Sequence, residues 1–281
     1  MKILVTGGSG YLGTHVCRFF SADDFSRRSG FDILNQQDAE RVADYDVVIH
    51  LAAHMDRSLD GADVCFRTNA DGTRNLLSHM RPNSVFIYAS TKDVYGKHAS
   101  EVPWGADETC DTSYIGQSPF EWSKYLGERY VEYYADQLNF RACIFRLSAV
   151  YARPSSGNDN GFVTHYVESV KHGWPIHLPA YAEPLRDILY VDDFSRACQA
   201  FIDSSRTNGL YNLGGGNSNA IRLREIIRKV GTMIDLEPVI EEDPRIPSPV
   251  PLEYISNINR LRDELSWWPQ VSIEEGLRNL L

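Results

Sequence analysis

Thr6-Gly7-Gly8-Ser9-Gly10-Tyr11-Leu12-Gly13 follows directly after a short apolar run at residues 2–5 and precedes a segment of helical spacing at 14–20. Glycines at this spacing are typical of a first strand, a tight turn and a helix N-terminus that together bind a dinucleotide. Gly7 permits the turn, Gly10 lets the backbone approach a pyrophosphate, and Gly13 lets the helix lie close to the strand. The helix N-terminus would offer free N–H groups and a partial positive charge to the phosphates.

The pattern of the first motif continues along the N-terminal half of the chain. Short apolar runs, expected as buried parallel strands, occur at residues 2–6, 46–52, 84–90 and 141–149. Segments of helical spacing lie between them, at 14–20, 38–43, 61–80 and 119–138. This alternation predicts an α/β fold with a doubly wound parallel sheet, whose ligands bind beyond the carboxyl ends of the strands.

Composition limits the classes of function. The chain has 281 residues, 43% of them hydrophobic, which is enough for one large domain or one domain with a smaller lobe. Its formal charge of −10 argues against a nucleic-acid partner attracted through phosphates. We see no apolar stretch of membrane-spanning length and no signal peptide, and the five cysteines lack metal-ligand spacing. We therefore expect a cytoplasmic protein without a metal site.

The residues around the second strand bear on the choice between NAD and NADP. An acidic residue at the end of this strand binds the ribose 2′-hydroxyl of NAD, whereas arginine accommodates the 2′-phosphate of NADP. The chain offers both, Asp23 and Asp24 before Arg27 and Arg28, and we favour NADP because the arginines fall closest to the expected strand end. The predicted cofactor-binding residues are Gly7, Ser9, Gly10, Tyr11, Leu12, Gly13, Arg27, Arg28, Asp32, Ile33, Leu51, Ala52 and Ala53. Asp32 and Ile33 would bracket the adenine, and the small residues after the third apolar run would let the cofactor pass closely.

Two further segments place reactive side chains near the same edge of the sheet. Ser90-Thr91-Lys92-Asp93 follows the apolar run at 85–89 and brings a hydroxyl, a cation and a carboxylate to the end of a central strand. Ser118, Pro119 and Glu121 form a helix start signal with a capping box. Phe120 and Lys124 are four residues apart in that helix and therefore share one face.

Taken together, these motifs resemble the extended short-chain dehydrogenase/reductases, in the nucleotide-sugar epimerase/dehydratase branch. The resemblance covers nearly the whole chain and rests on TGGSGYLG at 6–13, HLAA at 50–53, NADGTRNLL at 69–77, STKDVYG at 90–96, SPFEWSKYLGE at 118–128, RLSAVYARP at 146–154, RDILYVDD at 186–193 and YNLGGG at 211–216. It implies a Rossmann-type domain at 1–152 and about 187–212. A smaller C-terminal lobe at 153–186 and 213–281 would bind the nucleotide sugar.

The resemblance also implies a catalytic hydroxyl, tyrosine and lysine. Thr91 and Lys124 match the first and the last, and the lysine would also bind the nicotinamide ribose. Phe120 stands where the family has the tyrosine that removes a proton from the sugar hydroxyl. Three explanations remain open: a Tyr→Phe variant made to trap substrate, a natural enzyme with another base, or a non-catalytic protein.

Other positions carried over from the family concern a second base and the sugar nucleotide. Asp93 is the best candidate for another acid/base, and Tyr95 and Tyr114 are weaker candidates. Lys92 replaces the aspartate of the sugar dehydratases, which argues against simple 4,6-dehydration. Thr91, Asn160 and Arg186 are the predicted substrate-binding residues, and Arg186 would neutralise the diphosphate because its guanidinium offers a fixed fork of donors.

The sequence thus predicts an NAD(P)-dependent nucleoside-diphosphate-sugar epimerase, or a related oxidoreductase, that acts through a transient keto-sugar. An NADPH-dependent nucleotide-4-keto-sugar reductase is one alternative, and a non-catalytic NAD(P)-binding sensor or scaffold is another. The resemblance further implies a homodimer formed through the helices at 61–80 and 119–138.

Overall fold

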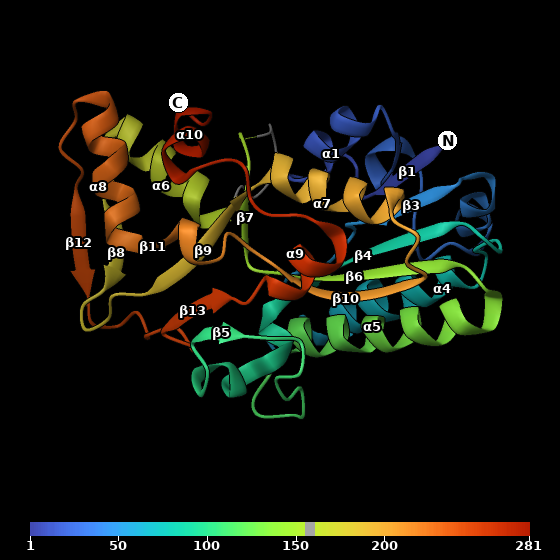
Figure 1. Ribbon diagram of the computed structural model, residues 1–281. Helices are drawn as coiled ribbons and strands as arrows, with labels where there is room; N and C mark the ends of the chain where they lie inside the picture. The colour runs from blue at the N-terminus through green and yellow to red at the C-terminus, as the bar shows by residue number, and fades with distance from the viewer. Residues whose placement is uncertain (155–160) are drawn as a thin grey trace.

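A six-stranded parallel sheet forms the centre of the molecule in the computed structural model, which describes residues 1–154 and 161–281 (Figure 1). Its strand order is β10-β6-β4-β3-β1-β2. The strands are β1 (Ile3–Thr6), β2 (Asp23–Phe25), β3 (Val47–His50), β4 (Val85–Thr91), β6 (Arg141–Leu147) and β10 (Asn208–Leu213). This arrangement confirms the predicted α/β fold with a doubly wound parallel sheet.

Both faces of this sheet are buried, which explains why its strands are nearly continuous apolar runs. Side chains alternate between the faces along each strand. Val5 packs into a core on one face, whereas the neighbouring Leu4 packs into a second core on the other. β2 has only three residues, so the second strand is as short as the sequence predicts.

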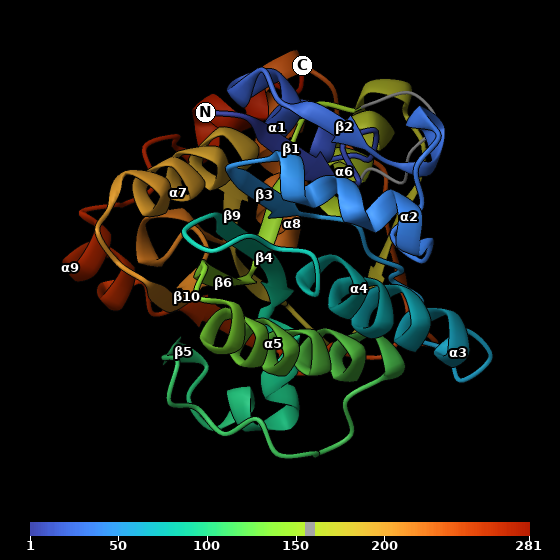
Figure 2. The same cartoon turned by 90° about the vertical axis from the view of Figure 1, so that its right-hand side faces the viewer.

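Helices cover the two faces. α1 (Gly13–Phe20) and α7 (Val191–Asp203) lie together on one face, and α5 (Pro119–Leu138) covers the other (Figures 1 and 2). α3 (Ala62–Cys65), a π-helical segment (Phe66–Gly72) and α4 (Thr73–Leu77) form one continuous helical stretch beside α5, near the predicted range of 61–80. The short α2 (Gln36–Ala39) and a 3-10 segment (Glu40–Asp44) occupy the region where the sequence predicts a helix at 38–43.

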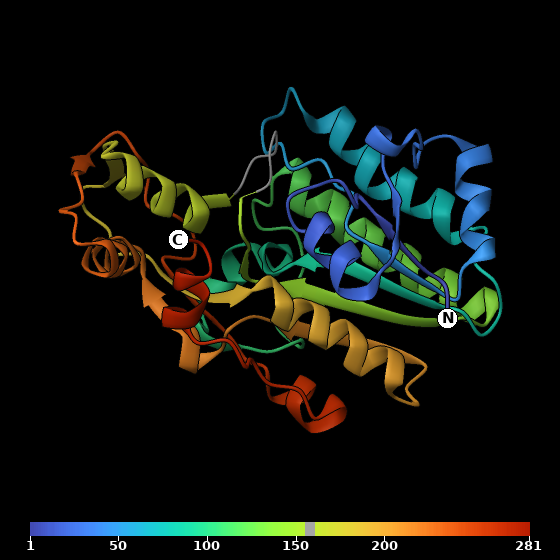
Figure 3. The ribbon, with the colours of Figure 1, turned by 90° about the horizontal axis from the view of Figure 1, so that it is seen from above.

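A second group of strands and helices lies beside the carboxyl edge of the central sheet (Figure 3). Its main sheet has the order β11-β9-β13-β5, and β7 pairs with β9. These strands are β5 (Trp104–Ala106), β7 (Ala149–Tyr151), β9 (Leu185–Tyr190), β11 (Ala220–Arg222) and β13 (Glu253–Ser256), and β8 (Ile176–Pro179) pairs separately with β12 (Ile240–Asp243). The remaining helices are α6 (Gly161–His172), α8 (Leu223–Ile234), α9 (Asn259–Leu265) and α10 (Ile273–Arg278).

Hydrogen bonds of the Tyr11 side chain connect the glycine motif to the second group of strands and helices. Its hydroxyl oxygen accepts a hydrogen bond from the Ala152 backbone N–H at 2.7 Å and lies 2.7 Å from the hydroxyl of Thr164 on α6. The loop after β1 is therefore anchored to the segment where the chain leaves the central sheet. No helix in the described parts of the chain is both long and apolar enough to pass through a membrane.

Candidate active site

The glycine motif forms a tight turn whose backbone leaves no room for side chains. Gly7 has a φ of +70°, and a Cβ there would lie 2.9 Å from the backbone of Ala52. A Cβ at Gly13 would lie 2.8 Å from Cα of Gly8. The Gly10 N–H donates to the Gly7 carbonyl at 2.9 Å, and α1 begins three residues later. This closed loop at a helix N-terminus fits the pyrophosphate of a dinucleotide.

Asp24 faces this loop from β2. Its Oδ2 accepts from the Ser26 hydroxyl at 2.9 Å, whereas its buried Oδ1 has no hydrogen-bond partner among the residues that the structure describes. That Oδ1 lies 2.5 Å from where a Cβ at Gly8 would be. An unpaired buried acceptor is costly, so a donor from a ligand, such as a ribose hydroxyl, fits this position.

The other predicted cofactor residues surround the same loop. Arg27 and Arg28 are exposed in a 3-10 turn directly after β2, and Arg28 donates to the Ser9 carbonyl at 3.2 Å. Ile33 is 6% exposed and packs into the core, and the neighbouring Asp32 accepts from the Leu34 N–H at 2.9 Å. The Ile33 side chain is therefore already used in packing.

The segment after β3 runs along the glycine turn. The Leu51 N–H donates to the Thr6 carbonyl at 3.1 Å, and the Ala52 N–H donates to the Thr6 hydroxyl at 3.3 Å. His50 lies beneath, fully buried, with its ring nitrogens 2.5 Å from the Thr6 hydroxyl and 2.8 Å from the Thr73 hydroxyl. Burial holds the pKa of His50 well below its ordinary value, so this imidazole is neutral.

Thr91 and Lys124 lie at the end of β4 and at the start of α5. Thr91 is 8% exposed, and its hydroxyl accepts from the Asp93 N–H at 3.2 Å. α5 begins at Pro119 as the capping signal predicts, and the Ser118 N–H donates to Glu121 at 2.6 Å. Lys124 is 3% exposed, with its Nζ 4.2 Å from the centroid of the Tyr88 ring.

Asp93 has a different environment from that of a general acid or base. Lys92 Nζ contacts Oδ1 of Asp93, and Arg57 lies 2.9 Å from Oδ2. Burial raises the pKa of Asp93, but these two cations outweigh it and hold that pKa well below its ordinary range. A carboxylate so stabilised is a poor proton acceptor, so the predicted acid/base role of Asp93 does not fit its contacts.

Arg57 is a site residue that the sequence analysis missed. It comes from the loop after β3, lies over the Phe120 ring at 5.3 Å, and also pairs with Glu121 at 2.7 Å. Because it lies in a polar loop without a motif, nothing in the sequence signals its proximity to Asp93. The pairing joins this loop to the start of α5.

The two remaining phenols have structural roles. Tyr95 is fully buried, donates to Asn212 at 2.7 Å, and has a pKa that burial raises to about 12. Tyr114 is 67% exposed and packs edge-on against Trp122, with ring centroids 5.5 Å apart. Neither contact is that of a base at neutral pH.

Arg186 lies in β9 with its guanidinium bound to backbone carbonyls. It donates to Leu185 at 2.7 Å, to Leu252 at 2.8 Å and to Pro251 at 2.9 Å. Burial lowers its pKa, and no carboxylate in the described ranges forms an ion pair with it. A partly buried cation without a counter-ion fits an anionic ligand group. Asn160 lies outside the described residues.

Asp187, next to Arg186, serves the fold instead. Its carboxylate accepts from the Ser148 hydroxyl at 2.5 Å and from the N–H groups of Gly216 and Ser256 at 3.2 and 3.1 Å. These bonds join β9 to the turn after β10 and to β13. This carboxylate forms no ion pair with Arg186.

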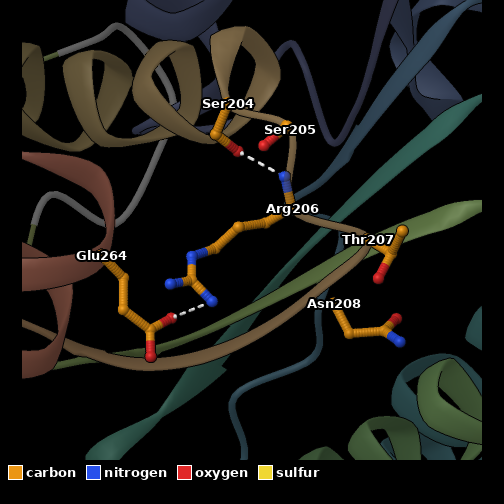
Figure 4. A pocket seen from close by; sticks show the side chains of 6 residues that line it. All are labelled: Ser204, Ser205, Arg206, Thr207, Asn208 and Glu264. Carbon is orange, nitrogen blue, oxygen red and sulfur yellow. Dashed lines mark hydrogen bonds and ion pairs between the residues drawn. The ribbon is translucent and has the colours of Figure 1, made fainter.

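A hollow of about 430 Å³ lies elsewhere, between the α7–β10 turn and α9 (Figure 4). Ser204, Arg206, Asn208 and Glu264 are among its lining residues, and Arg206 pairs with Glu264 at 2.9 Å. It lies where β10 begins, at the amino end of the parallel strands. The glycine loop, Thr91 and Arg57 follow the carboxyl ends, where sheets of this kind bind ligands.

The chain is similar to known nucleotide-sugar epimerases and dehydratases. The CDP-paratose 2-epimerase of Salmonella typhi is 26% identical over 340 residues, covering 100% of this chain and 98% of that protein. A dTDP-glucose 4,6-dehydratase of Mycobacterium tuberculosis (strain H37Rv) is 27% identical over 315 residues, covering 100% and 92%. The solved UDP-glucose 4-epimerase of Thermus thermophilus, in complex with NAD, has a TM-score of 0.81 and 25% identity, covering 100% and 97%.

The match to a family model spans most of the chain. The model described as the NAD dependent epimerase/dehydratase family covers residues 3–214, from β1 through the turn after β10. This range contains the glycine loop, Thr91, Lys124 and Arg186. The chain is therefore a member of the NAD-dependent epimerase/dehydratase family of enzymes.

Proposed function

We propose that this chain is an NAD-dependent nucleoside-diphosphate-sugar epimerase that acts through a transient keto-sugar. The observation that carries the proposal is the placement of the glycine loop, Thr91 and Lys124 at the carboxyl edge of one parallel sheet. The similarity to sugar-nucleotide epimerases supports the substrate class. We further propose that the dinucleotide binds residues 1–152 with about 187–212, and the sugar nucleotide binds 153–186 with 213–281.

The end of β2 bears on the choice of cofactor. The two arginines after β2 favour NADP on sequence grounds, whereas the buried, unpaired Oδ1 of Asp24 favours NAD. A ribose hydroxyl would satisfy that oxygen, but a 2′-phosphate would bring a second negative charge to it. We therefore propose NAD, with Asp24 as the ribose partner and the backbone of Gly7, Gly10 and Gly13 around the pyrophosphate.

The remaining residues would hold the substrate. A bound nicotinamide dinucleotide would supply the hydride acceptor and donor for the sugar carbon. We propose that the Thr91 hydroxyl hydrogen-bonds to the reacting sugar hydroxyl. Arg186 would hold the diphosphate through the guanidinium that has no counter-ion. Arg57 and Asp93 would fix the loop that borders the start of α5.

Calorimetry and product analysis test this function. We expect the purified chain to bind NAD, and to bind at least one of the UDP-, CDP- or dTDP-hexoses. With that sugar nucleotide, an epimerase converts it to an isomer without net consumption of NAD or NADPH. Stoichiometric loss of NADPH would instead identify the reductase, and binding of a dinucleotide without conversion of any sugar nucleotide would identify the sensor. Failure to bind either ligand would refute the proposal.

Phe120 provides a second test. A tyrosine at this position would restore the family's phenol one helical turn before Lys124. We expect Phe120→Tyr to raise turnover by at least about 10-fold, since general acid/base groups contribute about 10²–10⁴ in rate. Absence of turnover in both the unmodified chain and Phe120→Tyr, across the panel of sugar nucleotides, would argue for the non-catalytic alternative.

A further inference from the structure

Lys124 is a buried lysine without a counter-ion. In the described parts of the chain, its Nζ has no hydrogen bond and no ion pair, and its contact is the face of the Tyr88 ring. Glu128, the carboxylate on the same helix whose charge acts on Lys124, is already engaged. Glu128 binds Arg146 through two bonds of 3.0 and 2.7 Å and accepts from the Ser90 hydroxyl at 2.5 Å.

This environment disfavours the ammonium form. Removing a cation from water is costly unless an opposite charge compensates, and a neutral amine avoids that cost. Burial lowers the pKa of Lys124 to about 7, against the opposing effect of Glu128. Titratable and charged groups near this part of α5 include His50 on β3, Tyr88 on β4 and Glu128 on α5 itself. The elements packed against α5 also carry charged groups, among them Asp63, Arg67, Asp71, Arg74, Lys92 and Arg146. None of them forms an ion pair with Nζ.

The usual proton acceptor of this family is missing next to that amine. Phe120 occupies the same face of α5 one turn earlier, and its ring, 8% exposed, is covered by the Arg57 guanidinium. The other candidate bases are engaged, because Asp93 binds two cations and Tyr95 donates to Asn212. The Lys124 amine, in contrast, has a lone pair that no hydrogen bond from a described residue occupies.

We propose that the Nζ amine of Lys124 is the proton acceptor for the reacting sugar hydroxyl. The inference rests on the proposed epimerase function and names the base at that site. The hydroxyl O–H bond breaks and its proton forms an N–H bond with the lone pair of Nζ, which becomes an ammonium. The C–H bond on the same sugar carbon breaks, its electron pair passes as hydride to the nicotinamide of the dinucleotide, and a carbonyl forms. The ammonium returns the proton in the reverse step.

Lys124→Arg separates this role from cofactor binding. Arginine keeps the positive charge and the donors but stays protonated at every accessible pH, so it has no lone pair to offer. We expect kcat to fall at least about 100-fold. The Kd for NAD, measured by calorimetry, should change by a much smaller factor, because arginine keeps donors for the nicotinamide ribose. Lys171→Arg, on the exposed end of α6, is the matched control and keeps full activity. A Lys124→Arg enzyme that retains more than a tenth of kcat would overturn the proposal.

A second experiment tests the same role of Lys124 in a protein that carries tyrosine at position 120. In a Phe120→Tyr background the phenol can accept the proton, and arginine at 124 still lowers the tyrosine pKa by its charge. Lys124→Arg is expected to lower kcat in both backgrounds. With tyrosine at 120, the fold-loss should be no more than about a tenth of the fold-loss measured with phenylalanine at 120. Equal losses in the two backgrounds would show a positioning role and refute the assignment.

A titration without turnover completes the test. In protein labelled at lysine 13Cε, the NMR signal that Lys124→Arg removes should titrate near pH 7, and kcat/KM should rise with pH through the same value. A midpoint above pH 9 refutes this inference even if the chain epimerises sugar nucleotides. If the amine titrates near 7 but neither NAD nor a sugar nucleotide binds, the proposed function fails, and with it the catalytic use of the amine.

Discussion

Gly13→Ala tests how tightly the glycine turn is packed. Alanine is favoured over glycine in helices by roughly 1 kcal/mol, so helix propensity alone predicts a more stable protein. The contacts predict the opposite. A Cβ at Gly13 would lie 2.8 Å from Cα of Gly8, and it would lie still closer to the carbonyl oxygen of Gly7. Carbon atoms prefer separations of about 3.5 Å or more, so the turn must move by at least about 0.7 Å.

The atoms that must move belong to the backbone of Gly7 and Gly8, not to a flexible side chain. Overpacking of this kind costs about 1–3 kcal/mol. Each 1.4 kcal/mol corresponds to a factor of ten, so if NAD requires the native form of the turn, we expect the Kd for NAD to rise by about 5- to 140-fold. Calorimetry measures the affinity, and urea unfolding measures the stability of the same samples.

Gly173→Ala is the control for adding a methyl group without a steric clash. Gly173 has a φ of +68°, and a Cβ there would meet nothing within 4 Å. We expect this variant to lose about 1 kcal/mol of stability through left-handed backbone strain and to bind NAD normally. If Gly13→Ala binds NAD as tightly as the unmodified chain and unfolds at higher urea concentration, the close-packing argument is refuted.

Three further predictions concern other parts of the proposed sites. Asp24→Asn removes the charge beside the glycine loop, so the NADP-to-NAD affinity ratio should rise by at least about 10-fold in calorimetry; an unchanged ratio would exclude Asp24 as the ribose partner. Arg186→Met should weaken sugar-nucleotide binding by at least about 10-fold, because hydrogen bonds to charged groups are worth about 1.5–3 kcal/mol, and should leave NAD binding intact; equal loss of both ligands would instead indicate a folding defect. Tyr133 is 60% exposed on α5 and Val64 is 47% exposed on α3. If a homodimer forms through these helices, Tyr133→Glu should shift the mass measured by light scattering toward that of the monomer. A monomeric unmodified chain would refute the predicted dimer.

Local sequence signals predicted the elements that local physics decides. The capping signal at 118–121 predicts the start of α5, because Glu121 accepts from the Ser118 N–H and a proline at the first helical position has no N–H to satisfy. The glycine spacing predicts the turn after β1, because φ and close backbone approach depend on the absence of a Cβ. The apolar runs predict the central strands, because both faces of a parallel sheet are buried.

These local signals do not predict contacts between segments that lie far apart in the sequence. β5 follows β4 in the chain but pairs with β13 in the second sheet, and no local pattern encodes that pairing. Arg57 reaches Asp93 from a loop 36 residues earlier. The prediction of an acid/base role for Asp93 was made without knowledge of its contact with Arg57. Arg57 and Lys92 together keep the Asp93 carboxylate ionised.

Residue order alone was enough to specify the parallel sheet, the dinucleotide loop, and the presence of Thr91 and Lys124 beside a phenylalanine in place of a tyrosine. These features depend on residue spacing and on which atoms a side chain has. The electrostatic state of the same groups depends on the folded chain, since a pKa responds to burial and to charges brought from elsewhere in the sequence. Glu128 is bound to Arg146, and Asp93 to Arg57, and this distribution of partners leaves the Lys124 amine buried without a counter-ion.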